Sequence, residues 1–195
     1  MHLNSTLLSI VLFVPGLSQA EAPGAAFEGS WVINEELSDD TDKQVENAIK
    51  AAGGKVTRTK KKGKGRYKGG PPEQALYDHI SYDETLHFHY AEPEFRLTYA
   101  EGFERVFHSD GRRRTARASG TPRSERKDYA FASWSGSNKL FVEARPRDGG
   151  RTNEVYSLRK TESGEVVLHV ELKLNPLLFT GPLHITRVYQ RKSTN

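Results

Sequence analysis

The chain has 195 residues, of which 35% are hydrophobic and 28% are charged, and its net charge is +4. This length favours a single domain, and the 10% of aromatic residues argues against wholesale disorder. No apolar stretch reaches the roughly 20 residues of a transmembrane helix. The absence of cysteine excludes disulfides, thiol catalysis and thiolate metal sites.

The N-terminus predicts an export signal. Leu7–Leu17 is an apolar run as long as a signal-peptide core, and Ser18-Gln19-Ala20 supplies the small residues that a signal peptidase needs. We expect cleavage after Ala20, with Ala22 as the second choice, so residues 1–20 form the signal peptide and 21–28 a linker. Because no Lys or Arg precedes the apolar run, a buried N-terminal strand is the alternative. Export predicts a periplasmic or secreted protein.

A first strand is predicted at 29–34, and a short helix near 40–52. Three residues are candidate N-caps of this helix: Ser38, Asp39 and Asp40. Four apolar residues then recur at helical spacing: Val45, Ala48, Ile49 and Ala52. Gly53-Gly54 is expected to end the helix.

Two segments of the chain are strongly basic. Residues 55–68 contain eight basic residues and no acidic one, and 112–127 contain seven against a single acid, Glu125. The rest of the chain is therefore net acidic. Residues 53–72 hold almost no apolar side chains, so they predict a flexible surface loop.

From Thr85 onwards, apolar and polar residues alternate with the period of a β-strand. The expected strands are 86–90, 95–99, 104–109, 112–118, 129–135, 139–145, 152–160, 165–174 and 184–191. The short turns between them leave no room for crossover helices, so the strands should pair as an antiparallel meander. We therefore expect a mainly β domain at 29–195, either a barrel or a strongly curved sheet.

The apolar faces of these strands should point inward. The strongest face consists of Val166, Leu168, Val170, Leu172 and Leu174. Others combine small alanines with large aromatic residues, which is compatible with either a filled core or a small cavity. If a cavity exists, its lining candidates are Trp31, Tyr90, Tyr99, Trp134 and Tyr156.

Several motifs together resemble a group of uncharacterised secreted bacterial β-rich proteins. The motifs are Gly29-Ser30-Trp31 with Asn34, Ser38-Asp39-Asp40, Ser109-Asp110-Gly111, Ala132-Ser133-Trp134, Glu154-Val155-Tyr156-Ser157-Leu158 and Arg187-Val188-Tyr189. The G-x-W motif also resembles the first strand of lipocalins, which are up-and-down barrels that hold small apolar ligands. In lipocalins an arginine from the closing strand covers the tryptophan, which implies this role for Arg187 or Arg191. A helix and a long basic loop after the first strand depart from the lipocalin pattern.

His87 and His89 would share one face of a strand, as two metal ligands can, and His79 or His108 could add a third. However, Leu86 and Phe88 mark the opposite face as the core. We therefore interpret the two histidines as surface residues and predict neither a metal site nor a cofactor.

Two basic clusters could bind an anionic envelope polymer. They are Lys60, Lys61 and Lys62 in the first segment and Arg112, Arg113 and Arg114 in the second. Solvated charged loops are the alternative interpretation. Export and the near absence of aromatic residues from the first segment disfavour nucleic acid as a partner.

Signatures of catalysis are lacking: the chain has no G-x-S-x-G, H-E-x-x-H, P-loop or dinucleotide fingerprint. The sequence therefore predicts an exported, non-enzymatic protein that binds a small apolar or amphipathic ligand in a β-barrel. The alternative is an envelope-associated protein that binds polyanions through 55–68 and 112–127.

Overall fold

The computed structural model describes residues 22–53, 55, 84–100, 102–111, 114–117, 127–145, 151–175 and 182–193. The predicted signal peptide and most of the predicted basic loop lie outside these residues. The described elements are η1 (Ala25–Phe27), β1 (Gly29–Ile33), α1 (Thr41–Ala51), β2 (Thr85–Ala91), β3 (Glu94–Tyr99), β4 (Glu104–His108), β5 (Arg114–Arg117), β6 (Lys127–Trp134), β7 (Lys139–Arg145), β8 (Arg151–Lys160), β9 (Val166–Asn175) and β10 (Leu183–Arg191). Here η1 is a short 3-10 helix.

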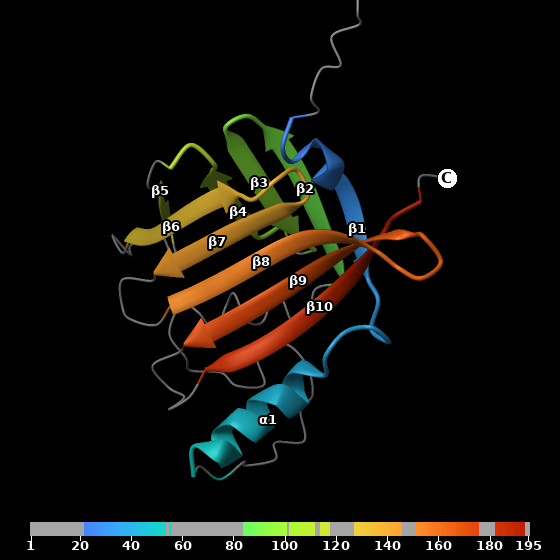
Figure 1. Ribbon diagram of the computed structural model, residues 1–195. Helices are drawn as coiled ribbons and strands as arrows, with labels where there is room; N and C mark the ends of the chain where they lie inside the picture. The colour runs from blue at the N-terminus through green and yellow to red at the C-terminus, as the bar shows by residue number, and fades with distance from the viewer. Residues whose placement is uncertain are drawn as a thin grey trace, which may run out of the picture.

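The ten strands of the described residues form one sheet in the order β4-β3-β2-β1-β10-β9-β8-β7-β6-β5. Every pair is antiparallel, and β1 lies between β2 and β10, so the first and last strands of the chain are neighbours. The edge strands β4 and β5 approach each other, but no backbone ladder joins them in the described part of the chain. The sheet curves into a nearly closed barrel (Figure 1). This confirms the expected antiparallel, lipocalin-like barrel.

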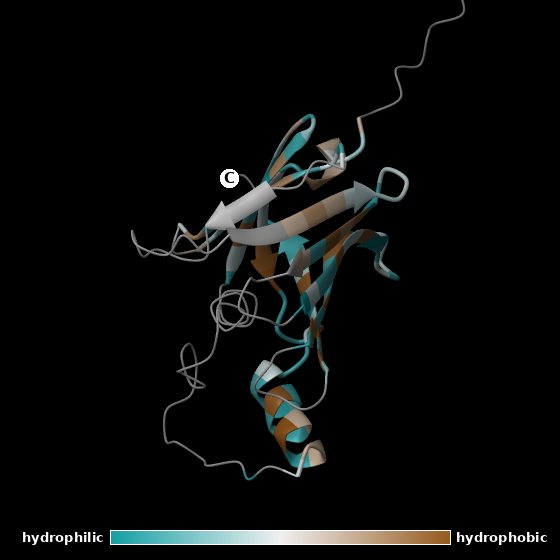
Figure 2. Cartoon of the chain, turned by 90° about the vertical axis from the view of Figure 1, so that its left-hand side faces the viewer, coloured by the Kyte–Doolittle hydropathy of each residue, from teal (hydrophilic) through white to brown (hydrophobic). Residues whose placement is uncertain are grey.

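Polar and apolar residues alternate along the strands (Figure 2). Because successive side chains of a strand point to opposite faces, this alternation determines which residues face the interior. On β9, Leu168, Val170, Leu172 and Leu174 are all buried, as expected. Val166 is the exception and corrects the prediction, because this residue is 38% exposed. It pairs with Lys160 at the end of the β8–β9 hairpin, where the alternation shifts by one residue and the next residue is buried instead.

The predicted helix is present as α1, and Asp40 is its N-cap. The Asp40 carboxylate accepts a hydrogen bond from the backbone N–H of Lys43 at 3.0 Å. Val45 is buried against the barrel core, and the helix packs on β10. Figure 2 shows α1 below the sheet, with apolar residues along part of its surface. Among the described residues, no helix combines the length and apolarity needed to cross a membrane.

Trp31 and Arg191 join β1, β10 and η1. The guanidinium of Arg191 lies 4.5 Å from the Trp31 ring centroid and donates hydrogen bonds to the backbone oxygens of Glu28 and Ala26 at 2.7 and 2.6 Å. The Trp31 indole N–H donates to the Phe27 oxygen at 2.9 Å. Of the two arginines that were expected to cover Trp31, Arg191 therefore does so.

Aromatic rings from opposite walls meet in the barrel beside η1. Phe88 on β2 and Tyr156 on β8 have ring centroids 5.8 Å apart, although three strands separate β2 from β8 in the sheet. Phe95 on β3 lies 6.1 Å from Trp134 on β6, and Phe27 of η1 lies 5.4 Å from Trp134. Side chains therefore fill the interior at this level, as close-packed cores generally do.

Candidate functional site

Five polar side chains meet among the apolar residues of the barrel interior: Tyr99 on β3, Arg105 on β4, and Thr152, Glu154 and Tyr156 on β8. Arg105 donates two parallel hydrogen bonds to Glu154, from Nη1 to Oε2 and from Nη2 to Oε1, both 2.7 Å long. The Tyr156 hydroxyl donates to Oε2 at 2.6 Å, and the Thr152 hydroxyl donates to Oε1 at 3.3 Å. We call these five residues the interior polar cluster.

Strand alternation explains how the cluster is assembled. Thr152, Glu154 and Tyr156 are alternate residues of β8 and all three are buried. In the ladders, Glu154 pairs with Val142 on β7 and Leu172 on β9, so apolar residues flank the carboxylate. Arg105 reaches it from β4 on the opposite wall.

The environment of the cluster is apolar and aromatic. The side chain of Glu154 is fully buried, and that of Arg105 is 11% exposed. The Arg105 guanidinium also lies 4.8 Å from the ring centroid of Phe107, within the range of a cation–π contact. Two charges are thus held in a low-dielectric interior, where burial without a partner would be costly.

Burial and pairing shift the protonation equilibria of the cluster. Burial and the neighbouring Glu154 carboxylate raise the pKa of Tyr156 well above its usual value. Burial also raises the pKa of Tyr99, although the charge of Arg105 partly opposes this. For Arg105, burial disfavours the charged form, but the attraction of Glu154 outweighs it and holds the pKa well above its usual value. The cluster therefore contains a guanidinium and two protonated phenols at neutral pH.

The five aromatic residues predicted to line a cavity lie in three different parts of the barrel. Tyr99 and Tyr156 belong to the interior polar cluster. Trp31 is fully buried under Arg191. Tyr90 and Trp134 contact each other edge to face, with ring centroids 5.7 Å apart, at the aromatic-filled level.

Sequence reasoning missed Arg105 and Glu154 as site residues. A signal was present in the alternation of the strands. Glu154 lies on the same face of its strand as Thr152 and Tyr156, and Arg105 lies on the same face as Phe107. A charged residue at an inward position of a predicted strand needs a buried partner. The inward charged positions on β4 and β8 could therefore have marked both residues as candidates, but not as partners of each other.

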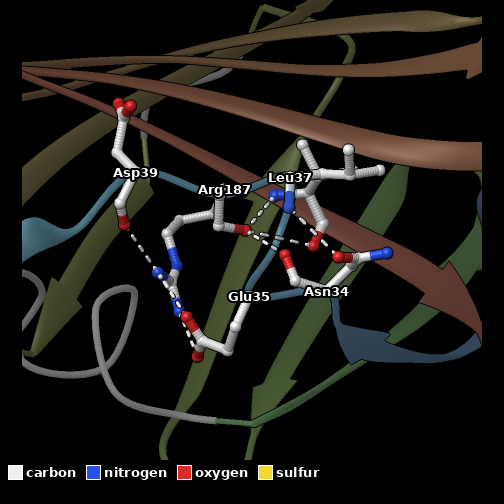
Figure 3. A network of polar contacts seen from close by, with 7 residues as sticks. Asn34, Glu35, Leu37, Asp39 and Arg187 are labelled. Carbon is white, nitrogen blue, oxygen red and sulfur yellow. Dashed lines mark hydrogen bonds and ion pairs between the residues drawn. The ribbon is translucent and has the colours of Figure 1, made fainter.

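Arg187, the other candidate to cover Trp31, instead holds the loop between β1 and α1. Its side chain is 3% exposed, and its guanidinium donates to the Glu35 carboxylate at 3.0 and 3.3 Å and to the Asp39 backbone oxygen at 3.0 Å (Figure 3). The Asp39 carboxylate accepts from the Thr186 N–H at 2.7 Å. These contacts fasten the loop to β10.

A surface pocket of about 330 Å³ lies over this loop. It is lined by Glu35, Ser38, Asp39, Asp40, Thr41, Asp42 and Arg187. The polar groups of Arg187 and Asp39 are already engaged in fastening the loop, and Asp40 caps α1. These residues therefore already have a structural role.

The two histidines of β2 lie on the outer face of the sheet, as predicted. Both are exposed. His87 Nδ1 lies 2.9 Å from the Ser30 hydroxyl, and His89 Nδ1 lies 3.1 Å from Glu28 Oε1. His108 is on β4 and His79 is outside the described residues. Within the described ranges, no three potential ligands gather around a metal position.

Of the six proposed polyanion-binding residues, five lie outside the described residues and one is described by its backbone alone. Lys60, Lys61, Lys62, Arg112 and Arg113 lie outside the described residues. Arg114 begins β5, where the backbone alone is described.

Comparison with known proteins gives little additional information. No family model matches the chain, and no curated protein matches it. Among solved structures, a point mutant of the fluorescent protein UnaG is similar, with 16% sequence identity and a TM-score of 0.48. The match covers 86% of this chain and 97% of that protein. A likeness this distant carries no argument about what the chain binds.

Proposed function

We propose that this protein binds a small amphipathic molecule inside its barrel and does not catalyse a reaction. The observation that carries the proposal is the interior polar cluster. A buried ion pair is weak evidence for stability, because apolar residues of similar volume often serve a core equally well. A few convergent polar groups in an apolar interior are instead typical of a small-molecule site.

We place the apolar part of such a ligand beside the cluster, where the inward side chains are small. The inward positions of β6 and β7 near this level include Ala130, Ala132 and Ala144. Ala132 is in the same row as Val142 and Glu154 across the ladders. Aromatic rings fill the neighbouring level, where Tyr156 contacts Phe88 and Phe95. The ligand therefore lies against β6 and β7, with its polar part at Arg105.

Native mass spectrometry of protein purified without detergent tests the proposal. We expect a bound mass, or binding of added alkyl and aromatic esters that also raises the unfolding temperature. A bare chain that binds none of these esters would overturn the proposal.

A pair of variants on one strand locates the binding. Ala132→Phe extends a side chain into the proposed ligand space and should abolish binding, while the exposed Ser133→Phe should leave it unchanged. If Ala132→Phe binds normally, the ligand does not occupy the interior at this level. If Ala132→Phe instead unfolds the chain, overpacking of a filled core explains the result. Ala144→Val, a smaller enlargement on β7, then tests whether the ligand occupies the interior at this level.

A further inference from the structure

The hydrogen-bonding capacity of Glu154 is already used. An ionised carboxylate offers about four acceptor positions. Glu154 accepts from both terminal nitrogens of Arg105, from Tyr156 and from Thr152, two donors on each oxygen. A ligand therefore finds no acceptor at Glu154, and its own hydroxyl or amine would have nothing to donate to there.

Arg105, in contrast, retains donors. A guanidinium carries five N–H groups. Nη1 reaches Glu154 at 2.7 Å, Tyr99 at 3.3 Å and Tyr156 at 3.5 Å, and Nη2 reaches Glu154. Among the described residues, neither Nε nor the second hydrogen of Nη2 has an acceptor. Arg105 also keeps a small exposed fraction, whereas Glu154 has none. The group that the cluster presents to a ligand is therefore an N–H donor.

The charges of the cluster cancel, which determines what kind of acceptor fits. The positive charge of Arg105 is compensated by Glu154 at hydrogen-bond distance. A ligand carboxylate at Arg105 would add a second negative charge a few ångströms from Glu154 in a low-dielectric interior, which disfavours its binding. An uncharged oxygen accepts the same N–H hydrogen bond without that repulsion.

We propose that the cluster selects a ligand whose polar part is an uncharged hydrogen-bond acceptor, such as an ester, ketone or amide oxygen, over the corresponding carboxylate. This inference rests on the proposed function, because it names the ligand class of the same site. Arg105 is the donor that touches the ligand. Glu154 is a positioning residue, which orients Arg105 and sets the charge of the site to zero.

Two matched pairs of probes test the selection: methyl dodecanoate with dodecanoate, and methyl naphthoate with naphthoate. We expect the wild-type protein at neutral pH to bind each ester at least roughly tenfold more tightly than its acid. Esters are also less soluble than acids, so the wild-type ratio alone does not decide.

The decisive variant is Glu154→Gln, which keeps the shape of the side chain and leaves the charge of Arg105 uncompensated. The ratio of ester to acid affinity should fall by roughly tenfold or more, because the carboxylate now pairs with Arg105. Arg159→Gln, which changes a charge in the exposed pair with Glu171, is the control and should leave the ratio unchanged.

If Glu154→Gln does not fold, the wild-type protein provides a second readout. Lowering the pH from about 7 to about 5 protonates part of the acid probe, so its apparent affinity should rise while that of the ester stays constant. An acid that binds as tightly as its ester, with no response to Glu154→Gln or to pH, would overturn the selection but leave ligand binding intact. Failure of all four probes to bind the wild-type protein would overturn the proposed function itself.

Discussion

At the scale of single residues, the Arg105–Glu154 pair is the feature of the core that most needs an explanation. Both side chains lose hydration inside the barrel, and two parallel hydrogen bonds only partly offset that loss. Each charge therefore depends on the other. Removing one partner leaves an uncompensated buried charge, whereas removing both leaves no charge in the interior polar cluster.

This dependence predicts a strongly non-additive mutant cycle. Arg105→Met should lower the free energy of unfolding by roughly 3–5 kcal/mol, because Glu154 stays buried without its cation. Arg105→Met combined with Glu154→Leu should recover most of that loss. Chemical denaturation measures both.

The exposed pair of Arg159 and Glu171 is the matched control for this cycle, since both side chains are about half exposed. Arg159→Met should cost only about 0–1 kcal/mol. If Arg105→Met were as mild as Arg159→Met, Glu154 would be solvated and the cluster would not be a low-dielectric site.

The same residues show why the sequence predicted only part of the site. Tyr99 and Tyr156 could be selected because inward aromatic residues are visible in the alternation of single strands. The partnership of Arg105 with Glu154 depends on curvature, since it joins residues 49 positions apart on opposite walls. A strand pattern gives the face of each residue but not the residue that it meets across the barrel.

At the scale of elements, local signals placed the strands and the helix well. Period-two alternation identified each strand of the meander, and turn residues marked the boundaries: Gly111, Gly136 and Gly164 all have positive φ. The short strand Arg114–Arg117 occupies only the middle of the predicted 112–118. Two of its four residues are arginines and only Ala116 is apolar, so the sequence offers little apolar alternation from which to place its ends.

The start of α1 depends on one carboxylate, which gives a prediction for that element. Asp40→Ala removes the acceptor for the Lys43 N–H and should destabilise the first turn by about 1 kcal/mol. Amide exchange in α1 should accelerate while the strands stay protected. Asp40→Asn keeps a capping oxygen and should behave almost like the wild-type protein. Equal effects of the two substitutions would show that the negative charge, rather than the hydrogen bond, starts the helix.

At the scale of the whole molecule, the order of the strands is what the sequence could not fix. Antiparallel pairing of consecutive strands followed from short turns. The pairing of β1 with β10, in contrast, joins the first and last strands of the chain. The contacts of Trp31 with Arg191 stabilise this junction. The lipocalin resemblance implied only that an arginine of the closing strand covers Trp31, and strand periodicity did not predict the pairing.

The pairing of β1 with β10 leaves the open edges at β4 and β5, which gives a prediction about stability across the barrel. Strands between two neighbours donate their N–H groups to ladders on both sides, whereas edge strands leave alternate N–H groups unpaired. β9 lies in the middle of the longest ladders, with β8 and β10. Hydrogen exchange should therefore be slowest in β9 and, among the strands, fastest in β4 and β5.

Arg105 ties the edge strand β4 to the opposite wall, so this pattern should also respond to the site. Arg105→Met should accelerate exchange in β4 more than in β9, since it removes the attachment of β4 to Glu154 on β8. A bound ester that accepts from Arg105 should slow exchange in β4 without changing β9. If β4 is as protected as β9 in the free wild-type protein, β4 and β5 are joined by hydrogen bonds in solution. Access to the interior would then lie at an end of the barrel rather than between its edges.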